Sequence, residues 1–270
     1  MKKILATIIL AAAALMPAAA QCPLQNTAFN PGETLRYQLY FNWKFVWLKA
    51  GTASLEIKDA TYKGKTCLKA SLITKGSPRT DKFFMMRDTL TSFFTPALEP
   101  LYYRKGAREG KRYYTDEAWY THRANAVSVR QLYQREGSEA RTNEQTSAEC
   151  VFDMVSMMMR ARSFDPTAYK EGQRIQFLMA DNGRIKSETL VFRGRKNFKM
   201  ESTGVTYRCL VFSFIERKDK KDKEVVTFYI TDDKNHIPVR LDLFLRFGTA
   251  KAFLTSQTEP RNPQTSIIKK

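Results

Sequence analysis

Histidine, the side chain that enzymes use most for proton transfer near neutral pH, is almost missing: the 270-residue sequence has two, His122 and His236. The sequence also contains no Cys-x-x-Cys pair, no Gly-x-Ser-x-Gly elbow, no His-Glu-x-x-His motif and no glycine-rich phosphate loop. Zinc sites, serine hydrolases, metalloproteases and nucleotide-binding enzymes depend on such patterns. The sequence therefore predicts a protein that is not an enzyme and has no metal site and no cofactor.

The one long apolar run without charge lies at the start of the chain, from Ile4 to Met16. Two lysines precede it, and a proline and three alanines follow it, which is the pattern of a cleavable signal peptide. The run is shorter than the roughly 18–20 residues that a membrane-spanning helix needs. We therefore predict a signal peptide over residues 1–20 and an exported protein of the periplasm or cell envelope, with no transmembrane segment. A lipoprotein anchored at Cys22 is the less favoured alternative, because Gln21 stands where a small residue is expected.

Acidic residues are few compared with basic ones, 27 against 45, which gives a formal net charge of +18. In the cytoplasm this charge would indicate a nucleic-acid partner. Export removes that partner and leaves the anionic groups of the envelope, such as lipid headgroups, lipopolysaccharide and acidic glycans. The alternative is a charge that only keeps the surface solvated. We expect a lipid or other anionic envelope component, or envelope proteins, as partners.

Cysteine is also scarce, with Cys22, Cys67, Cys150 and Cys209. An even number of cysteines in an oxidising compartment permits disulfides, but a chain of this length does not need them. Cys67 and Cys209 lie in strand-like runs, where buried free thiols are common. The pairing therefore stays open.

Alternation of apolar and polar residues predicts strands along most of the chain. The clearest run extends from Leu35 to Trp47, and Asp181-Asn182-Gly183 marks a strong hairpin turn. The mixed charges of 217–224 indicate a solvated hairpin loop, and turn-rich segments are expected at 95–97 and 106–110. The remaining strands are expected over 53–57, 68–72, 84–94, 101–104, 111–120, 126–134, 175–179, 184–192, 207–215, 225–230 and 237–247.

One segment, 149–163, has helical spacing of its apolar residues, with Ser147 as the expected N-cap and Pro166 beyond the end. Its broad apolar face predicts a helix buried against a sheet. The fold class is therefore all-β with one central buried helix: a strongly curved antiparallel sheet or barrel, lipocalin-like or a half-barrel. We expect either a single β-rich domain over 21–270 or two β halves joined by helix 149–163. An outer-membrane barrel fits less well, because several runs are too charged.

Several short stretches are spread over nearly the whole chain in a fixed order. They are Gly32-Glu33 with Leu35 and Tyr37; Ala50-Gly51-Thr52-Ala53; Arg87-Asp88 with Ser92; Leu98-Glu99-Pro100; Arg108-Glu109-Gly110; Phe152-Asp153 with Arg160; and Asp232-Asp233, Ile237-Pro238-Val239 and Phe247-Gly248. Together they resemble the exported bacterial proteins of domain-of-unknown-function family 3108. The resemblance implies an envelope β protein of unassigned activity, and it brings no catalytic residues.

Three groups of residues are the candidates for a binding site. Trp43, Phe45 and Trp47 alternate on a strand and would either line a pocket for an acyl chain or pack in the core. The methionines Met157 and Met158 would line an adaptable cavity or fill the core. Arg87 and Arg160 stand among apolar residues, where a buried cation needs an anionic ligand or a structural carboxylate; Asp88 and Asp153 are the expected structural partners.

The leading hypothesis is a non-enzymatic binder of a lipid-like or amphiphilic anionic ligand, with an apolar lining and a basic mouth. The alternative is a structural or protein-interaction module whose concave face is filled by its own helix. A glycan hydrolase is the third hypothesis. It would use paired carboxylates such as Asp116-Glu117 or Asp232-Asp233, which also suit calcium, but adjacent strand residues face opposite sides.

Overall fold

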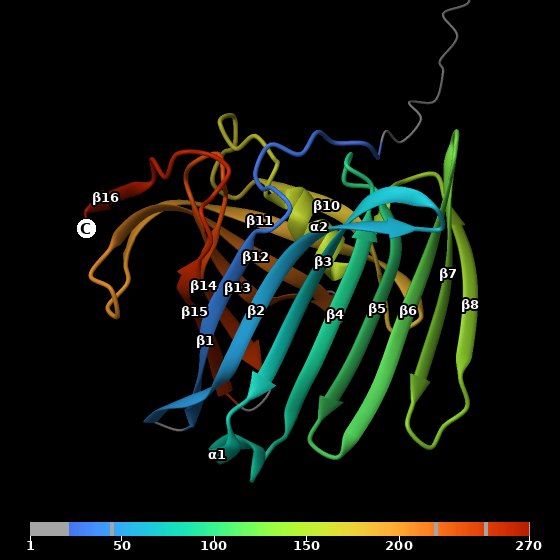
Figure 1. Cartoon of the computed structure of the whole chain (residues 1–270), viewed down its shortest axis with the longest axis horizontal. Helices are drawn as coiled ribbons and strands as arrows, with labels where there is room; N and C mark the ends of the chain where they lie inside the picture. The colour runs from blue at the N-terminus through green and yellow to red at the C-terminus, as the bar shows by residue number, and fades with distance from the viewer. Residues whose placement is uncertain (1–21, 44–45, 219–220, 246–247, 270) are drawn as a thin grey trace, which may run out of the picture.

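The strands of the protein form one continuous sheet. The computed structural model describes residues 22–43, 46–218, 221–245 and 248–269. In this part of the chain the strand order is β8-β7-β6-β5-β4-β3-β2-β1-β15-β14-β13-β12-β11-β10-β9, and β16 pairs with β12 (Figure 1). The first half of the chain gives β1 (Thr34–Trp43), β2 (Val46–Tyr62), β3 (Lys65–Gly76), α1 (Pro78–Asp81), β4 (Met86–Phe94), β5 (Pro100–Glu109), β6 (Arg112–Arg123), β7 (Ala126–Arg135) and β8 (Arg141–Ser147). The second half gives β9 (Val151–Phe152), α2 (Met154–Ala161), β10 (Arg174–Asp181), β11 (Arg184–Lys199), β12 (Thr206–Lys218), β13 (Lys221–Thr231), β14 (Pro238–Leu245), β15 (Gly248–Gln257) and β16 (Ile267–Lys269).

Tight hairpins connect most neighbouring strands. The pairs Lys63-Gly64 and Asn182-Gly183 each adopt positive φ at both positions, 48° and 77° in the first turn and 52° and 73° in the second. Two such residues form the turn whose twist matches that of antiparallel strands. The hairpin predicted at Asp181-Asn182-Gly183 is therefore confirmed.

The sheet curves until its two ends meet. Figure 1 shows β1–β8 as one layer in front, with β10–β15 behind and running across it. Pairing of β1 with β15 joins the two halves. The tip of the β10–β11 hairpin then reaches the first half, because the Asp116 carboxylate accepts a 2.7 Å hydrogen bond from the Asn182 amide and the Gln131 side chain donates to the Arg184 carbonyl. The result is a nearly closed, barrel-like sheet, as the sequence predicts.

Helix α2 lies between the two halves and is shorter than expected. Its N-cap is Asp153, whose carboxylate accepts from the backbone amides of Val155 at 2.9 Å and Ser156 at 2.8 Å. The prediction of Ser147 as N-cap is wrong, because Ser147 ends β8, and Val151 and Phe152 pair with β10 as a short parallel strand. Among the described residues, no helix is long and apolar enough to cross a membrane.

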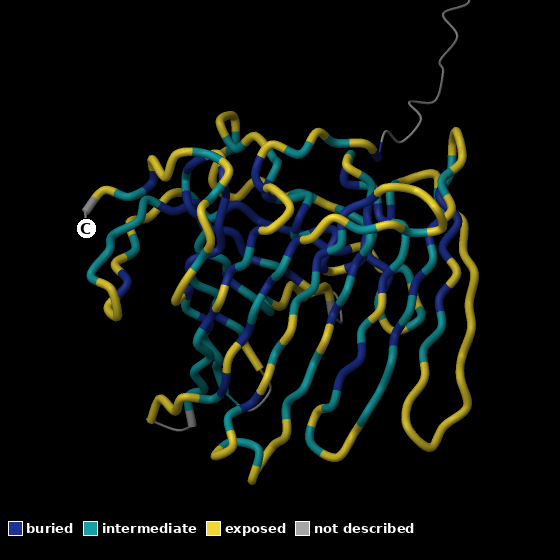
Figure 2. Tube along the Cα trace, in the orientation of Figure 1, coloured by how far each residue is buried: buried dark blue, intermediate teal, exposed yellow. Residues whose placement is uncertain are grey.

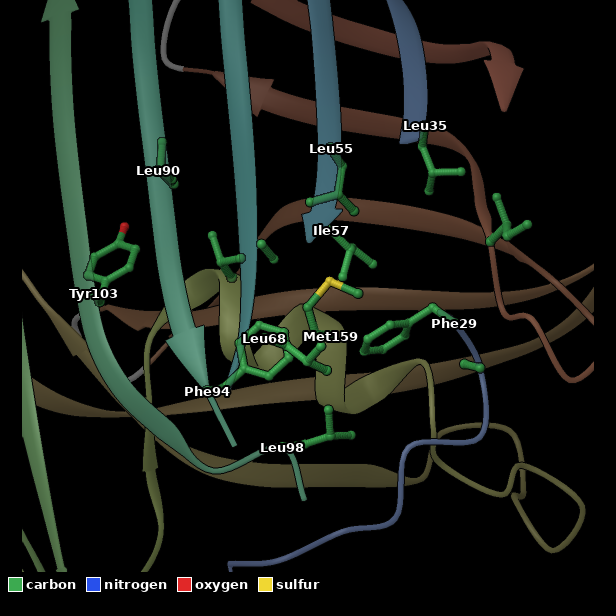
Figure 3. Close-up of a cluster of buried hydrophobic side chains, with 14 of the residues drawn as sticks. Phe29, Leu35, Leu55, Ile57, Leu68, Leu90, Phe94, Leu98, Tyr103 and Met159 are labelled. Carbon is green, nitrogen blue, oxygen red and sulfur yellow. The ribbon is translucent and has the colours of Figure 1, made fainter. Parts of the chain in front are cut away.

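Two faces of α2 contact different parts of the core. Val155 and Met159 belong to the main cluster, and Figure 3 shows Met159 beside Phe29, Leu68 and Phe94. Met157 belongs to a second cluster with residues of β11 and the strands next to it. The prediction of a central helix buried against the sheet is therefore confirmed.

Several strand boundaries differ from the prediction. The expected single strand from Leu35 to Trp47 is wrong: the chain reverses there, and Trp43 pairs with Val46. The apolar alternation misleads because it runs on in the sequence, although Trp47 pairs with Asn42 and so lies on the opposite face from Phe41. The turn-rich segment expected at 106–110 is also wrong, because β5 continues to Glu109. The sequence does not predict β8, β9, β15 and β16. The expected end of the last strand at Phe247 lies outside the described residues.

A disulfide joins Cys22 to Cys150 across 128 residues of sequence. Cys67 and Cys209 are free thiols in the core. The Arg160 guanidinium donates to the carbonyl of Cys22, so the start of the described chain is attached to the helix region twice. The structure thus settles a pairing that the sequence leaves open.

Candidate ligand-binding site on the concave face

One row of cross-strand partners is apolar across eight neighbouring strands. Residues that pair across a sheet have side chains on the same face, so the register alone places these side chains in line. From β2 to β10 the row consists of Leu48, Phe41, Ala250, Leu243, Val226, Phe214, Leu190 and Ile175. We call this row the apolar wall.

The apolar wall faces the inside of the curved sheet. Ile175, Leu190 and Phe214 pack in one cluster with Phe152 and Met157, which come from the segment held between the two halves. Away from the helix the side chains become more accessible: Leu190 is 8% exposed, and Leu48 at the other end is 36% exposed. The wall therefore starts in the core and ends at the tip of the β1–β2 hairpin.

A second row lies beside the apolar wall on the same face. It consists of Leu39, Ala252, Leu241, Phe228, Phe212 and Phe192. Phe192 is 1% exposed, and Tyr169 packs edge-on against Phe192 and Phe212. This second row is most closely packed at Phe192 and Phe212, next to the partly exposed wall.

The concave face of the first half is more polar. Burial raises the pKa of Asp88 on β4 to about 6 and that of Asp116 on β6 to about 6. In the second half, burial likewise raises the pKa of Glu188 on β11 to about 7. One carboxylate oxygen of Asp88 and one of Asp116 are buried without a hydrogen-bond partner among the described residues. These carboxyl groups therefore favour the neutral form near the mildly acidic end of the physiological range.

Replacement of Asp116 by Asn tests this assignment. The raised pKa means that Asp116 costs nothing below its ordinary pKa of 3.8 and destabilises the fold increasingly as the pH rises towards about 6. We expect Asp116→Asn to raise the free energy of unfolding by about 1–2 kcal/mol at about pH 8 and to leave it unchanged at about pH 3.5. Urea unfolding at the two pH values measures the difference, and equal effects at both would contradict it.

Lys49 and Lys251 lie near the exposed end of the apolar wall but on the other face of the sheet, because both pair with Tyr40, whereas Leu48 and Ala250 pair with Phe41. Lys49 follows Leu48 and is exposed. The Lys251 ammonium lies 4.3 Å from the centre of the Trp47 ring. Positive charge therefore lies at the edge of the sheet where the wall reaches solvent, on the convex side.

The predicted aromatic and methionine positions separate in the structure. Trp47 is 41% exposed and lies at the end of the sheet beside Lys251, and Met157 packs at the buried end of the apolar wall. Met158 packs instead against the main core. Phe45 and the side chain of Trp43 lie outside the described part of the chain.

The two predicted arginines have partners other than the expected ones. Arg87 forms a two-bond ion pair with Asp81 of α1, one bond being 2.9 Å long, so the expected pairing with Asp88 is wrong. Arg160 lies over the Phe152 ring at 5.0 Å and donates to a backbone carbonyl. The pairing of Arg160 with Asp153 is also wrong, because Asp153 caps α2 and accepts from Ser92 at 2.9 Å.

Arg162 is a deeply buried cation that the sequence pattern does not predict. Its side chain is 1% exposed and makes two bonds to Glu33, of 2.5 and 3.0 Å, and two to the Asn235 carbonyl, of 3.2 and 3.0 Å. Its own carbonyl contacts His236 Nδ1 at 2.6 Å, and burial lowers the pKa of that histidine. A signal was present in Glu33, which lies in one of the stretches that carry the family resemblance.

The acidic pairs considered for hydrolysis or calcium do not act as pairs. Asp116 points inward to Asn182, whereas Glu117 accepts a 2.5 Å bond from the Tyr102 hydroxyl on the outer face. Asp232 binds the guanidinium of Arg208 at 3.1 Å. Asp233 accepts from Thr231 and from the Asn235 amide. Each of these four carboxylates therefore has a separate local role.

The outer face of β6–β8 carries a pocket of about 250 Å³. Arg130 covers the face of the Trp119 ring at 4.4 Å, and the Ser128 hydroxyl donates to Glu144 at 3.0 Å. The pocket is lined by Lys63, Trp119, Thr121, Ser128, Arg130 and Glu144. Its polar lining contrasts with the apolar wall, which is the better candidate for a lipid-like ligand.

The fold and the apolar wall define a barrel-like β protein with a helix between its two halves. The model of the family described as "Protein of unknown function (DUF3108)" matches residues 36–255, and the chain belongs to this family. A comparison with curated proteins finds no match. Among solved structures, the chain is similar to a β-barrel-like protein of domain of unknown function DUF1849 from Brucella abortus. The TM-score is 0.55 at 8% identity, over 86% of this chain and 99% of that chain, and this likeness concerns the fold alone.

Proposed function

We propose that this protein is an exported, non-enzymatic binder of an amphiphilic anionic lipid of the cell envelope. Its acyl chain lies along the apolar wall, and its acidic headgroup lies at the exposed end, near the positive charge of Lys49 at the edge of the sheet. The observation that carries the proposal is the uninterrupted apolar register of eight strands, most of it still partly accessible. Covering such surface stabilises a complex by about 25 cal/mol per Å².

Two features support export. The N-terminal residues have the pattern of a signal peptide, and the Cys22–Cys150 disulfide suits an oxidising compartment. The disulfide also uses the thiol of Cys22, which a lipid anchor would need. A soluble exported protein therefore fits the structure better than a lipoprotein does.

Uptake of a fluorescent acyl-chain probe tests the proposal. We expect the double variant Leu243→Ser with Val226→Ser to bind the probe about tenfold more weakly or worse, because it removes two apolar side chains from the middle of the wall. The matched control is Ile73→Ser, which changes a 39% exposed residue of β3 outside the wall.

A second variant separates binding from folding. Ala250→Trp keeps the wall apolar but fills the space in front of it, and it should reduce uptake in the same way. Thermal unfolding of each variant checks that it is folded. Uptake that is absent from the wild type, or equal in all variants, would favour a structural module with a filled core.

A further inference from the structure

The exposed apolar side chains of the protein gather at one end of the sheet. Among the described residues, eleven large apolar side chains are exposed, and eight of them lie on three connections at this end. Phe83 is the extreme case at 87% exposed. We call these eight the apolar rim: Val46, Trp47, Leu48, Phe83, Phe84, Met85, Phe244 and Leu245.

The register brings the three connections side by side. Thr249, which follows the β14–β15 turn, pairs with Asn42, and Asn42 pairs with Trp47 across the β1–β2 hairpin. The α1 segment comes next, because the Ser77 amide donates to the Ala50 carbonyl at 2.8 Å. Figure 1 shows the β1–β2 hairpin and α1 together at the lower edge of the molecule, and Figure 2 shows that edge coloured mostly as exposed.

The charge around the apolar rim is positive. Exposed basic residues on these connections and on the adjoining β5–β6 turn are Lys49, Lys75, Arg79, Lys82, Lys111 and Arg112. The acids in the same segments are Asp81, which is paired with Arg87, and Glu109, which accepts from the Tyr114 hydroxyl. The β7–β8 turn, with Glu136 and Glu139, lies at the far end of this edge, beyond the apolar connections.

Exposed aromatic side chains surrounded by lysine and arginine are the combination that binds the interface of an anionic bilayer. The aromatic rings enter the headgroup region while the cations remain at the phosphate level. An apolar patch of this kind on an otherwise charged surface marks an interaction site. We propose that the apolar rim docks the protein onto an anionic lipid bilayer.

The rim continues into the apolar wall, since Leu48 belongs to both. Docking would therefore place the open end of the wall at the membrane surface, from which a lipid can move without crossing water. The docking proposal stands without the ligand proposal. If the chain binds vesicles but takes up no probe, the apolar rim still docks the protein, and only the binding of an acyl chain on the apolar wall is contradicted.

Flotation of the purified chain with lipid vesicles tests the docking. We expect binding to phosphatidylcholine vesicles that contain about one third phosphatidylglycerol, and much weaker binding to pure phosphatidylcholine. The double variant Phe83→Ser with Trp47→Ser should lower the partition coefficient about tenfold or more. The matched control, Met154→Ser with Ile268→Ser, also removes two exposed apolar side chains but lies away from the rim.

The role of positive charge is tested with the double variant Arg79→Gln with Lys82→Gln. Its control is the double variant Lys63→Gln with Lys65→Gln, at the opposite end of the sheet. Only the first pair should weaken binding to the anionic vesicles. Equal binding by the rim variant and the wild type would overturn the proposal. So would a dimer that sediments in the absence of lipid, dissociates in the rim variant and does not float with vesicles, because the rim would then bind a second copy of the chain.

Discussion

Replacing Glu33 by Gln should lower the free energy of unfolding by about 3–5 kcal/mol, because it leaves the Arg162 charge buried without its partner. The side chains of both residues are almost fully buried, at 3% and 1% exposed. Arg162 would keep its two bonds to the Asn235 carbonyl, but a neutral amide cannot balance a guanidinium. Urea or thermal unfolding measures the loss.

Two controls make the result specific. The double variant Glu33→Leu with Arg162→Met should cost less than Glu33→Gln alone, because neither charge remains buried. Glu56→Gln breaks a surface pair with Lys58, whose side chain is 68% exposed, and should change stability by less than about 0.5 kcal/mol. A loss below about 1 kcal/mol in Glu33→Gln would show that the pair is not buried in solution.

Loss of the Cys22–Cys150 disulfide should destabilise the protein by about 2–5 kcal/mol, because the bond closes a long loop in the unfolded chain. The sequence separation is 128 residues, which places the expected effect towards the upper end. The double variant Cys22→Ser with Cys150→Ser should unfold at a lower temperature than the wild type. A reductant should lower the wild-type midpoint by a similar amount.

The reductant must have no effect on the double variant, because Cys67 and Cys209 are free thiols in the structure. A wild-type midpoint that does not respond to reductant would mean that Cys22 and Cys150 are unpaired. A shift in the double variant would mean that another pair of cysteines is oxidised instead.

Local sequence patterns predicted much of the fold. The alternation of apolar and polar residues predicts most of the strands, because every second side chain of these strands faces the core. The Asn182-Gly183 turn is recognisable from its residue types. The same reasoning fails where the residue pattern does not show that the chain reverses or that a segment joins the sheet. The apolar alternation continues in the sequence through the reversal between Trp43 and Val46. Strand β8 is wholly polar; it pairs with β7, and its Asn143 and Gln145 side chains bond to the β10–β11 hairpin.

The binding site depended on information that local patterns do not contain. Phe41 and Phe214 lie in one row only because eight strands pair in a particular register, and a shift of one residue in any pair would turn part of the row outward. The Arg162–Glu33 pair joins residues 129 positions apart. From sequence, Arg160 and Arg162 differ only by their position on a helix, and the helix boundary was itself misplaced.

The apolar wall and the apolar rim divide the proposed activity into two steps that can be lost separately. The wall accounts for holding an acyl chain, and the rim accounts for contact with the bilayer that supplies it. A rim variant should still take up a soluble short-chain probe, whereas a wall variant should still float with vesicles.

Native mass spectrometry after incubation with phosphatidylglycerol tests the central claim most directly. The account predicts that the wild-type chain retains one lipid molecule and that Ala250→Trp, with its wall filled, retains none under the same conditions. A wild-type chain that stays free of lipid, or a lipid adduct of equal intensity in both proteins, would contradict it.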